Sequence, residues 1–455
     1  MRKKEVNMLS GPIANGLLTI AFPIMIMNVL TSLFNVIDMT ILKSFGSDEL
    51  AVGAVGTCGT LISLISGLLI GVSAGANVVV AKYIGKGNQE RVDRSIGTAI
   101  ALAIGGGLLL LLIGVCFAKV FLRWTNCPDE LLSQATLYFQ LYFAGTPILM
   151  VYTFASAILR SSGDSQRPMF YSVLGGVVKV VGTFLFVAVF KMSVEGVAFA
   201  TIISWLTSGV LAFRALLKNE GVVKLKPERI RFYRKEMGEI LFIGIPAGLQ
   251  QALYSVANVI ITATVNSFGA AATTGISIAN NFDGLLYQIS VSPALAVMPY
   301  VSQNVGVGNI KRATKAVSRG MLITIAFGAT FGALSAIFSG QLSSIMSSDP
   351  AVIAYSQQKM VIISSTYFIC GINEIMGAAL KGMGKPIVTT AATLIFMCAI
   401  RFVWVYLIFP LCPNLTFLYL IWPIGWVMSI TMLLFWYFPT VKKLSALCAN
   451  TATQN

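Results

Sequence analysis

The chain has 455 residues, of which 56% are hydrophobic and only 11% are charged, and its mean hydropathy is +0.82. Soluble domains carry about a quarter charged residues, so this composition indicates a polytopic membrane protein. The chain contains no histidine, which excludes imidazole proton relays, histidine metal sites and Ser-His or Cys-His catalysis.

Apolar runs of bilayer length predict twelve membrane-spanning helices, near residues 13–39, 50–76, 92–117, 134–158, 168–190, 196–217, 238–263, 271–300, 312–338, 351–379, 386–409 and 415–438. Most of the 32 Lys and Arg residues fall in alternate loops. The positive-inside rule therefore predicts that both termini are cytoplasmic. The net charge of +15 then reflects topology, and no nucleic-acid partner is expected.

The first predicted span carries a polar stripe. Asn28, Asn35 and Asp38 fall on one helical face of this otherwise apolar segment. An ionised carboxylate near the middle of a membrane helix costs roughly 2.5–3.5 kcal/mol, so Asp38 needs a partner, a proton or water. We interpret Asp38 as an ion-coupling residue; the alternative is an acid that only joins two helices.

The second half of the chain repeats the first at nearly constant spacing. Pro23 aligns with Pro246, and the NVI tripeptide at 35–37 aligns with NVI at 258–260. Six helices per repeat give both halves the same orientation, and substrate sites in such folds lie between the halves. Pro23 and Pro246 interrupt their spans and are candidate hinges, although a proline kink can also serve shape alone.

We therefore predict an all-α membrane protein with two pseudo-symmetric six-helix lobes. Its predicted parts are an N-terminal lobe at 1–217, a cytoplasmic interfacial linker at 218–237, a C-terminal lobe at 238–440 and a cytoplasmic tail at 441–455. The connection between the lobes mixes Arg and Lys with Ile230, Phe232 and Tyr233 in a helical pattern. This pattern predicts an interfacial helix.

The second half contains two further candidate ion-coupling acids. Asp283 shares a helical face with Asn280 and Tyr287, and Glu374 follows Tyr367 on a similar stripe. Burial raises the pKa of a carboxylate and a nearby cation lowers it, so acids under both influences can load and release a proton near neutral pH.

The polar stripe of the first span is partly reproduced in the seventh. Gln251, Tyr254 and Asn258 occupy this second stripe, whereas Ile261 stands where the first half has Asp38. The chemistry of the two lobes has therefore diverged.

Two cations lie inside predicted spans, at roughly matching repeat positions. Buried cations need acidic partners, so we expect Lys179 to pair with Asp38, and Arg401 to pair with Glu374 or Asp283. Permanent ion pairs that only hold helices together are the alternative. Three acids against two bases would leave the interior at most slightly negative.

Together these motifs resemble the multidrug and toxic compound extrusion (MATE) family, particularly its bacterial Firmicute-type branch. The resemblance rests on NVIDMTILKSFG at 35–46, YIGKGNQERV at 83–92, ILRSSGDSQRP at 158–168, YVSQNVGVGNIKRA at 300–313 and NEIMGAALKGMGKP at 373–386. It covers nearly the whole chain.

The resemblance implies two six-helix lobes around a central cavity. It also implies a secondary active exporter that exchanges amphipathic, often cationic, compounds for H⁺ or Na⁺ by alternating access. Asp38 matches the family's first-helix acid, and Glu374 matches an acidic position often found in its tenth helix. The chain departs from the family at Lys179 and Thr183, where many relatives carry Asn and Asp.

We therefore expect a monomeric, multi-pass protein of the bacterial plasma (inner) membrane that is not an enzyme. Its expected partners are small-molecule amphipathic substrates and membrane lipid, with no cofactor and no metal apart from H⁺ or Na⁺ as the coupling ion. One alternative is a flippase for lipid-linked precursors of the same superfamily, which would favour a more basic cavity. A more distant alternative is an intramembrane enzyme, for which the chain lacks an HExxH or Cys-His signature.

Overall fold

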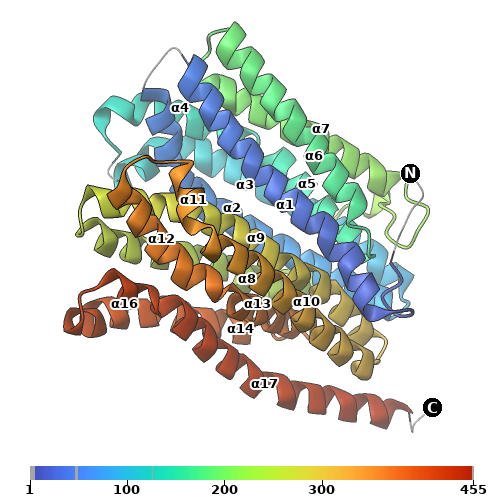
Figure 1. Cartoon of the computed structure of the whole chain (residues 1–455). Helices are drawn as coiled ribbons and strands as arrows, with labels where there is room; N and C mark the ends of the chain where they lie inside the picture. Colours follow the sequence, from blue (N-terminus) through green and yellow to red (C-terminus); the bar gives the residue numbers. More distant parts are fainter. Residues whose placement is uncertain (1–5, 47–49, 126, 453–455) are drawn as a thin grey trace. The chain divides into compact units, whose positions relative to one another are not determined.

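The computed structural model describes residues 6–46, 50–125 and 127–452, which form helices joined by short loops, with no strand among them (Figure 1). Within this part of the chain, 10 helices are long and apolar enough to cross a membrane, and up to 12 spans result if each of two bent helix pairs counts as one. The predicted all-α membrane fold is confirmed. The first five residues of the predicted N-terminal lobe and the last three of the predicted tail lie outside the described residues.

The described residues of the first half form seven α-helices. They are α1 (Ile13–Phe45), α2 (Leu50–Gly85), α3 (Gln89–Trp124), α4 (Asp129–Ala144), α5 (Thr146–Ser161), α6 (Gln166–Thr183) and α7 (Val194–Leu217). A π-helix, Phe184–Val189, continues α6. The helices α6 and α7 pack against each other, and in Figure 1 these green helices run alongside the blue α1.

The second half repeats this order. Its helices are α8 (Arg234–Asn266), α9 (Ala270–Gly306), α10 (Ile310–Ile337), α11 (Ser339–Ser344), α12 (Pro350–Ser365), α13 (Tyr367–Gly382), α14 (Pro386–Thr393), α15 (Ile400–Val403), α16 (Leu415–Tyr419) and α17 (Ile421–Ala452). Two π-helical segments, Leu394–Ala399 and Trp404–Ile408, join α14 and α15 into one span that ends near Leu411.

The internal repeat extends to helix caps and bends. α4 and α5 meet at 46°, and α12 and α13 meet at 47°. Asn88 caps α3 by accepting a bond of 3.0 Å from the Arg91 amide, and Asn309 caps α10 by accepting one of 3.1 Å from the Arg312 amide. The predicted repeat is therefore present in local geometry as well as in sequence.

Both bends fall inside segments that we predicted as single straight spans. Gly145 separates α4 from α5, and Pro147 in the first turn of α5 lacks the amide proton that would continue α4. Thr366 separates α12 from α13, and its hydroxyl bonds back to the Ile362 carbonyl oxygen at 3.0 Å. Such back-bonding competes with the helical backbone bonds.

The chain divides into two compact units, and the division falls within two helices. The first unit contains Ile26–Ile245, and the second contains Asn7–Met25 together with Pro246–Asn455. The boundary in α1 lies shortly after Pro23, and the boundary in α8 lies at Pro246. The first part of each of these helices therefore packs in a different unit from the remainder.

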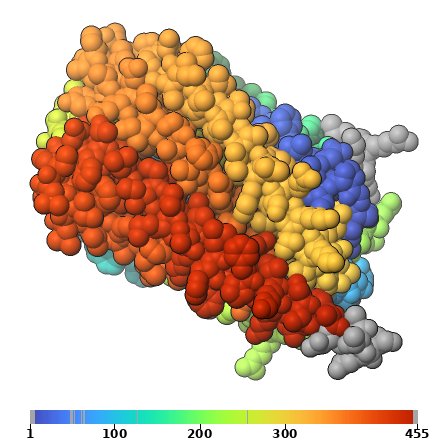
Figure 2. Space-filling view, turned by 60° about the horizontal axis from the view of Figure 1, so that its bottom comes forward, coloured from blue at the N-terminus to red at the C-terminus, as the bar shows by residue number. Residues whose placement is uncertain are grey.

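Each unit has its own apolar core and an apolar outer surface. The core of the first unit includes the fully buried Leu122 and Phe139. On the surface of the second unit, α17 exposes Phe435 and Phe438 by 75% and 65%, and the red C-terminal helix lies open on the face shown in Figure 2. Large exposed aromatic side chains on a bilayer-length helix are suited to contact with lipid.

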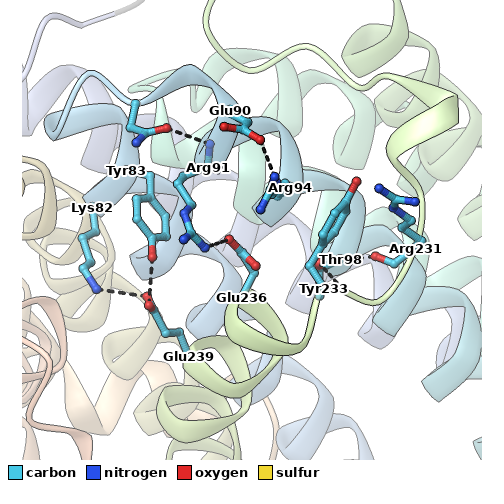
Figure 3. A network of polar contacts seen from close by, with 11 residues as sticks. Lys82, Tyr83, Glu90, Arg91, Arg94, Thr98, Arg231, Tyr233, Glu236 and Glu239 are labelled. Carbon is cyan, nitrogen blue, oxygen red and sulfur yellow. Dashed lines mark hydrogen bonds and ion pairs between the residues drawn. The ribbon is translucent and has the colours of Figure 1, made fainter.

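The connection between α7 and α8 is not the interfacial helix that we predicted. It contains only a 3₁₀ turn, Pro227–Arg229. The Thr98 hydroxyl donates to the Arg231 carbonyl oxygen at 3.4 Å and accepts from the Tyr233 amide at 3.3 Å, which holds this stretch of backbone against α3 (Figure 3). Gly97 allows the approach, because a Cβ there would lie 1.9 Å from the Arg229 carbonyl oxygen.

Ion pairs fix the start of α8 to the end of α2 and to the start of α3 (Figure 3). Arg91 pairs with the buried Glu236. Glu239 accepts bonds from Lys82 at 3.0 Å and from the Tyr83 hydroxyl at 2.8 Å. All of these residues belong to the first unit.

Candidate functional site

The first polar cluster joins α1 to α6 within the first unit. The Asp38 carboxylate is 3% exposed, and its Oδ2 lies 2.5 Å from the Lys179 ammonium. Thr183 donates to Asp38 Oδ1 at 2.9 Å, and Lys179 donates to Asn35 Oδ1 at 2.8 Å. The predicted pairing of Lys179 with Asp38 is confirmed.

Helical spacing explains why these groups converge. Asn35 and Asp38 are one turn apart on α1, and Lys179 and Thr183 are one turn apart on α6. Thr183 was not predicted as a site residue, although a hydroxyl one turn from an intramembrane lysine is a usable signal. Asn28 lies on the same stripe of α1, but within the described part of the chain no hydrogen bond joins its side chain to this cluster.

The second polar cluster lies in the second unit and includes a cation that we did not predict. The Lys359 ammonium on α12 is 2.8 Å from Asp283 Oδ2 on α9, and it also bonds to Asn280. The side chains of Lys359 and Asp283 are only 3% and 12% exposed. The Tyr367 hydroxyl donates to the Asp283 backbone carbonyl at 3.0 Å, which ties α13 to the same place.

We did not predict Lys359 as a site residue, because it lies near the start of its span among Ser and Gln residues. The signal was nevertheless present, since a lysine inside a bilayer-length run requires an acidic partner. With Lys359, the described spans hold three bases beside the three predicted acids. The balance of charge is therefore even, which agrees with the expected interior that is at most slightly negative.

The predicted partners of Arg401 are wrong. Asp283 is paired with Lys359, and the Arg401 guanidinium instead donates to Asn258 Oδ1 at 2.6 Å. It also lies over the rings of Tyr254 and Trp422, at 4.9 Å and 5.3 Å from their centroids. Arg401 is 2% exposed, so an amide oxygen and two ring faces take the place of a carboxylate.

A cavity of about 320 Å³ opens beside these groups, wholly within the second unit. Its lining includes the predicted residues Tyr254, Asn258, Asn280, Asp283, Tyr287 and Tyr367, together with Lys359, Tyr419 and Trp422, which we did not predict. A concave space lined by convergent polar groups is the usual form of a ligand site.

Three predicted polar site residues of the second half do not line this cavity, namely Gln251, Glu374 and Arg401. Gln251 is hydrogen-bonded to the lining residue Tyr287 but is not itself part of the lining. Glu374 on α13 makes no ion pair among the described residues, and Lys381 is a cation that interacts with it electrostatically. The structure therefore brings Asp283 into the cavity and leaves Glu374 outside it.

Known proteins resemble this chain over nearly its whole length. A family model described as MatE matches residues 23–185 and 246–407, so that its two matches begin at Pro23 and Pro246. The probable multidrug resistance protein YpnP of Bacillus subtilis is 24% identical over 399 residues, covering 88% of this chain and 89% of that protein. An FAD transporter of Shewanella oneidensis is 24% identical over 389 residues, covering 84% and 85%.

A solved structure shows the same fold. The crystal structure of a MATE in complex with MaL6 superposes with a TM-score of 0.90 at 19% identity, and the match covers 98% of this chain and 100% of that one. The similarity includes both halves of the repeat.

Proposed function

The chain belongs to the MatE family of multi-pass membrane transporters, and we propose that it is a secondary active exporter that exchanges amphipathic compounds, many of them cationic, for H⁺ or Na⁺ by alternating access. This is a family of transporters, so the expectation that the chain is not an enzyme is confirmed, and the intramembrane-enzyme alternative is dropped. The observation that carries the proposal is the buried pair of Asp38 and Lys179.

In this proposal the ion acts at Asp38. A proton or Na⁺ that reaches the carboxylate competes with Lys179 for the same oxygen, and Lys179 keeps Asn35 as its second acceptor. The pair can thus exist in a joined and a separated arrangement. An ion shifts the equilibrium between the joined and the separated arrangement only if it binds one of them more tightly than the other. Because the ion and Lys179 compete for one carboxylate oxygen, the ion binds the separated arrangement more tightly.

We extend the coupling role to Asp283 and Glu374 in the second unit. Asp283 is paired with Lys359 much as Asp38 is paired with Lys179, so the same competition applies there. Glu374 has no ion pair among the described residues and would respond to the ion directly.

Movement is proposed to concentrate at Pro23 and Pro246. The chain before α1 is held in the second unit, where Arg312 donates to the backbone carbonyls of Met8 and Gly11 at 3.0 Å and 2.9 Å. The start of α8 is held in the first unit by the pair of Arg91 and Glu236. Because both helices are anchored before their prolines, bending at the proline is the simplest response to a shift of the remainder.

One observation favours the flippase for lipid-linked precursors as a second candidate. Lys359 raises the number of buried bases near the polar clusters to three, and anionic headgroups require basic surroundings. Translocation of a fluorescent lipid pyrophosphate in reconstituted vesicles would distinguish it from efflux of a soluble dye.

Transport by the purified full chain in proteoliposomes tests the main proposal. A pH gradient and a Na⁺ gradient are imposed separately, and accumulation of a cationic dye is followed by fluorescence. One of the two gradients is expected to drive accumulation that an ionophore for that ion abolishes. Equal dye movement with and without both gradients would overturn ion-coupled export.

We place the protein in the plasma membrane as a monomer, with both termini in the cytoplasm. Cys448 near the end of α17 offers a test of this orientation, because it is a free thiol that is partly exposed. A membrane-impermeant maleimide should label it in inverted vesicles and not in intact cells, once the two exposed cysteines, Cys116 and Cys412, are replaced by serine. Labelling in intact cells would contradict the orientation.

A further inference from the structure

We propose that the cavity of the second unit binds small aromatic anions that carry a hydrogen-bond donor. The export of such a ligand rests on the proposed transport function, whereas its binding does not. Such a ligand matches the size of the cavity, the balance of charge around it and two polar atoms in its wall that lack partners.

The cavity has the size and the surface for an aromatic ligand. Its volume of about 320 Å³ lies at the lower end of the range for small-molecule sites. Five of its lining residues are aromatic: Tyr254, Tyr287, Tyr367, Tyr419 and Trp422. Such a wall favours stacked or edge-to-face contact with a planar ring.

The charges around the cavity leave one cation over, because Glu374, which interacts with the lining residues Tyr254 and Tyr287, is offset by Lys381. Asp283 and Lys359 neutralise each other across 2.8 Å, and both line the cavity. Arg401 lies directly behind the wall, against the lining residues Asn258 and Trp422, and has no carboxylate partner among the described residues. One uncompensated cation in a buried, weakly screened site attracts an anion and repels a cation.

Two of the five lining rings, those of Tyr254 and Trp422, are already engaged by cations of the protein. Arg401 lies over Tyr254 and Trp422, and the Lys359 ammonium lies 5.8 Å from the Trp422 ring. An aromatic cage for a cation needs free ring faces. A cationic ligand would meet these two like charges there, so the arrangement selects against it.

Two buried polar atoms in the wall lack a hydrogen-bond partner. They are Asp283 Oδ1 and the Tyr419 hydroxyl. Buried polar atoms are usually satisfied, so each marks a position where a ligand group could bond. Asp283 Oδ1 can only accept a bond while the carboxylate is ionised, which requires a hydroxyl or amino donor on the ligand.

Three ligands that share one shape and differ in charge test whether the cavity prefers an anion, a neutral molecule or a cation. 4-Hydroxybenzoate, 4-hydroxybenzamide and 4-hydroxybenzamidine share a ring and a hydroxyl donor and carry an anionic, a neutral and a cationic group. Binding to the purified full chain is measured by titration calorimetry. We expect the benzoate to bind about tenfold more tightly than the amide, and the amidine not to bind. Equal affinities, or tighter binding of the amidine, would overturn the proposal.

Two variants assign the selectivity to Arg401. Arg401→Gln removes the cation and is expected to weaken benzoate binding by about tenfold or more. Asn258→Asp keeps Arg401 and adds a carboxylate beside it, so benzoate should weaken and the amidine should gain. Arg214→Gln removes an exposed cation of α7 in the first unit and serves as the control with unchanged affinities. Unchanged selectivity in a folded Asn258→Asp protein would contradict the role of Arg401.

The binding experiment fails independently of the transport experiment. If the cationic dye is exported under an ion gradient but the benzoate does not bind, the exporter proposal stands and the anion site is refuted. If the benzoate binds selectively but no gradient drives any transport, the site stands and the exporter proposal is refuted.

Discussion

Arg401 donates a hydrogen bond of 2.6 Å to Asn258, and at the corresponding positions of the first half Lys179 donates one of 2.8 Å to Asn35. A cation bonded to an asparagine is therefore common to both units. The first unit adds Asp38 to this arrangement, whereas the second unit has Ile261 at the matching position. The units share this scaffold and differ in charge at it, because the cation of the first unit has a carboxylate partner and the cation of the second unit has an amide partner.

Substitutions of Asp38 and Lys179 should have strongly non-additive effects on the free energy of unfolding. Lys179→Gln leaves a buried carboxylate without its cation, which is expected to cost about 3–5 kcal/mol. Asp38→Asn/Lys179→Gln should lose much less, because no uncompensated charge remains. Thermal unfolding of the detergent-purified variants measures both effects. Additive losses would show that the two residues act independently.

The missing acid of the second unit can be restored. Ile261→Asp places a carboxylate one helical turn from Asn258, where Arg401 can pair with it. We expect this variant to fold, and the same substitution in an Arg401→Gln background to be less stable by about 1–3 kcal/mol. Equal melting temperatures of Ile261→Asp in the two backgrounds would show that Arg401 does not reach the new acid.

The ion pair of Glu236 with Arg91 should hold the linker in place. Glu236→Ala removes a bond between charged groups worth about 1.5–3 kcal/mol, so hydrogen exchange of the linker amides should accelerate by about tenfold or more. Glu228→Ala, in the exposed 3₁₀ turn, is the matched control and should leave exchange unchanged. The same acceleration in both variants would refute the anchoring role.

Two equivalent glycines should respond differently to one substitution. Gly163 and Gly384 both have positive φ, at 89° and 77°. A Cβ at Gly163 would lie 2.5 Å from the Val6 carbonyl oxygen, whereas at Gly384 it would meet nothing within 4 Å. Gly384→Ala should cost about 1–2 kcal/mol for the strained backbone alone, and Gly163→Ala distinctly more. Melting temperatures in the reverse order would contradict this difference.

Much of the fold and part of the site followed from sequence patterns. The length of the apolar runs is enough to predict the spans, and an acid and a base buried in one lobe are enough to predict the pairing of Asp38 with Lys179. Conversely, the bend at Thr366 leaves no trace in hydropathy, because it depends on hydroxyl groups that bond back to the helix.

The partners of Arg401 could not be deduced in the same way. Lys359 takes Asp283 first, and an arginine among aromatic rings and an amide does not need a carboxylate. Which acid meets which base depends on how α9 and α12 pack, and hydrophobic periodicity does not encode that arrangement. The linker was mispredicted for a related reason, since bonds to α3 outweigh its local helical pattern.

The central claim is that Asp38 couples the ion to transport, and comparison of two transport modes in proteoliposomes tests it most directly. Dye accumulation driven by an ion gradient is measured beside dye exchange at equal dye concentration without a gradient, for the wild type and for Asp38→Asn. We predict that Asp38→Asn abolishes the gradient-driven accumulation and retains the exchange, because alternation persists without the ion-responsive carboxylate. Gradient-driven accumulation by Asp38→Asn at the rate of the wild type would contradict the account.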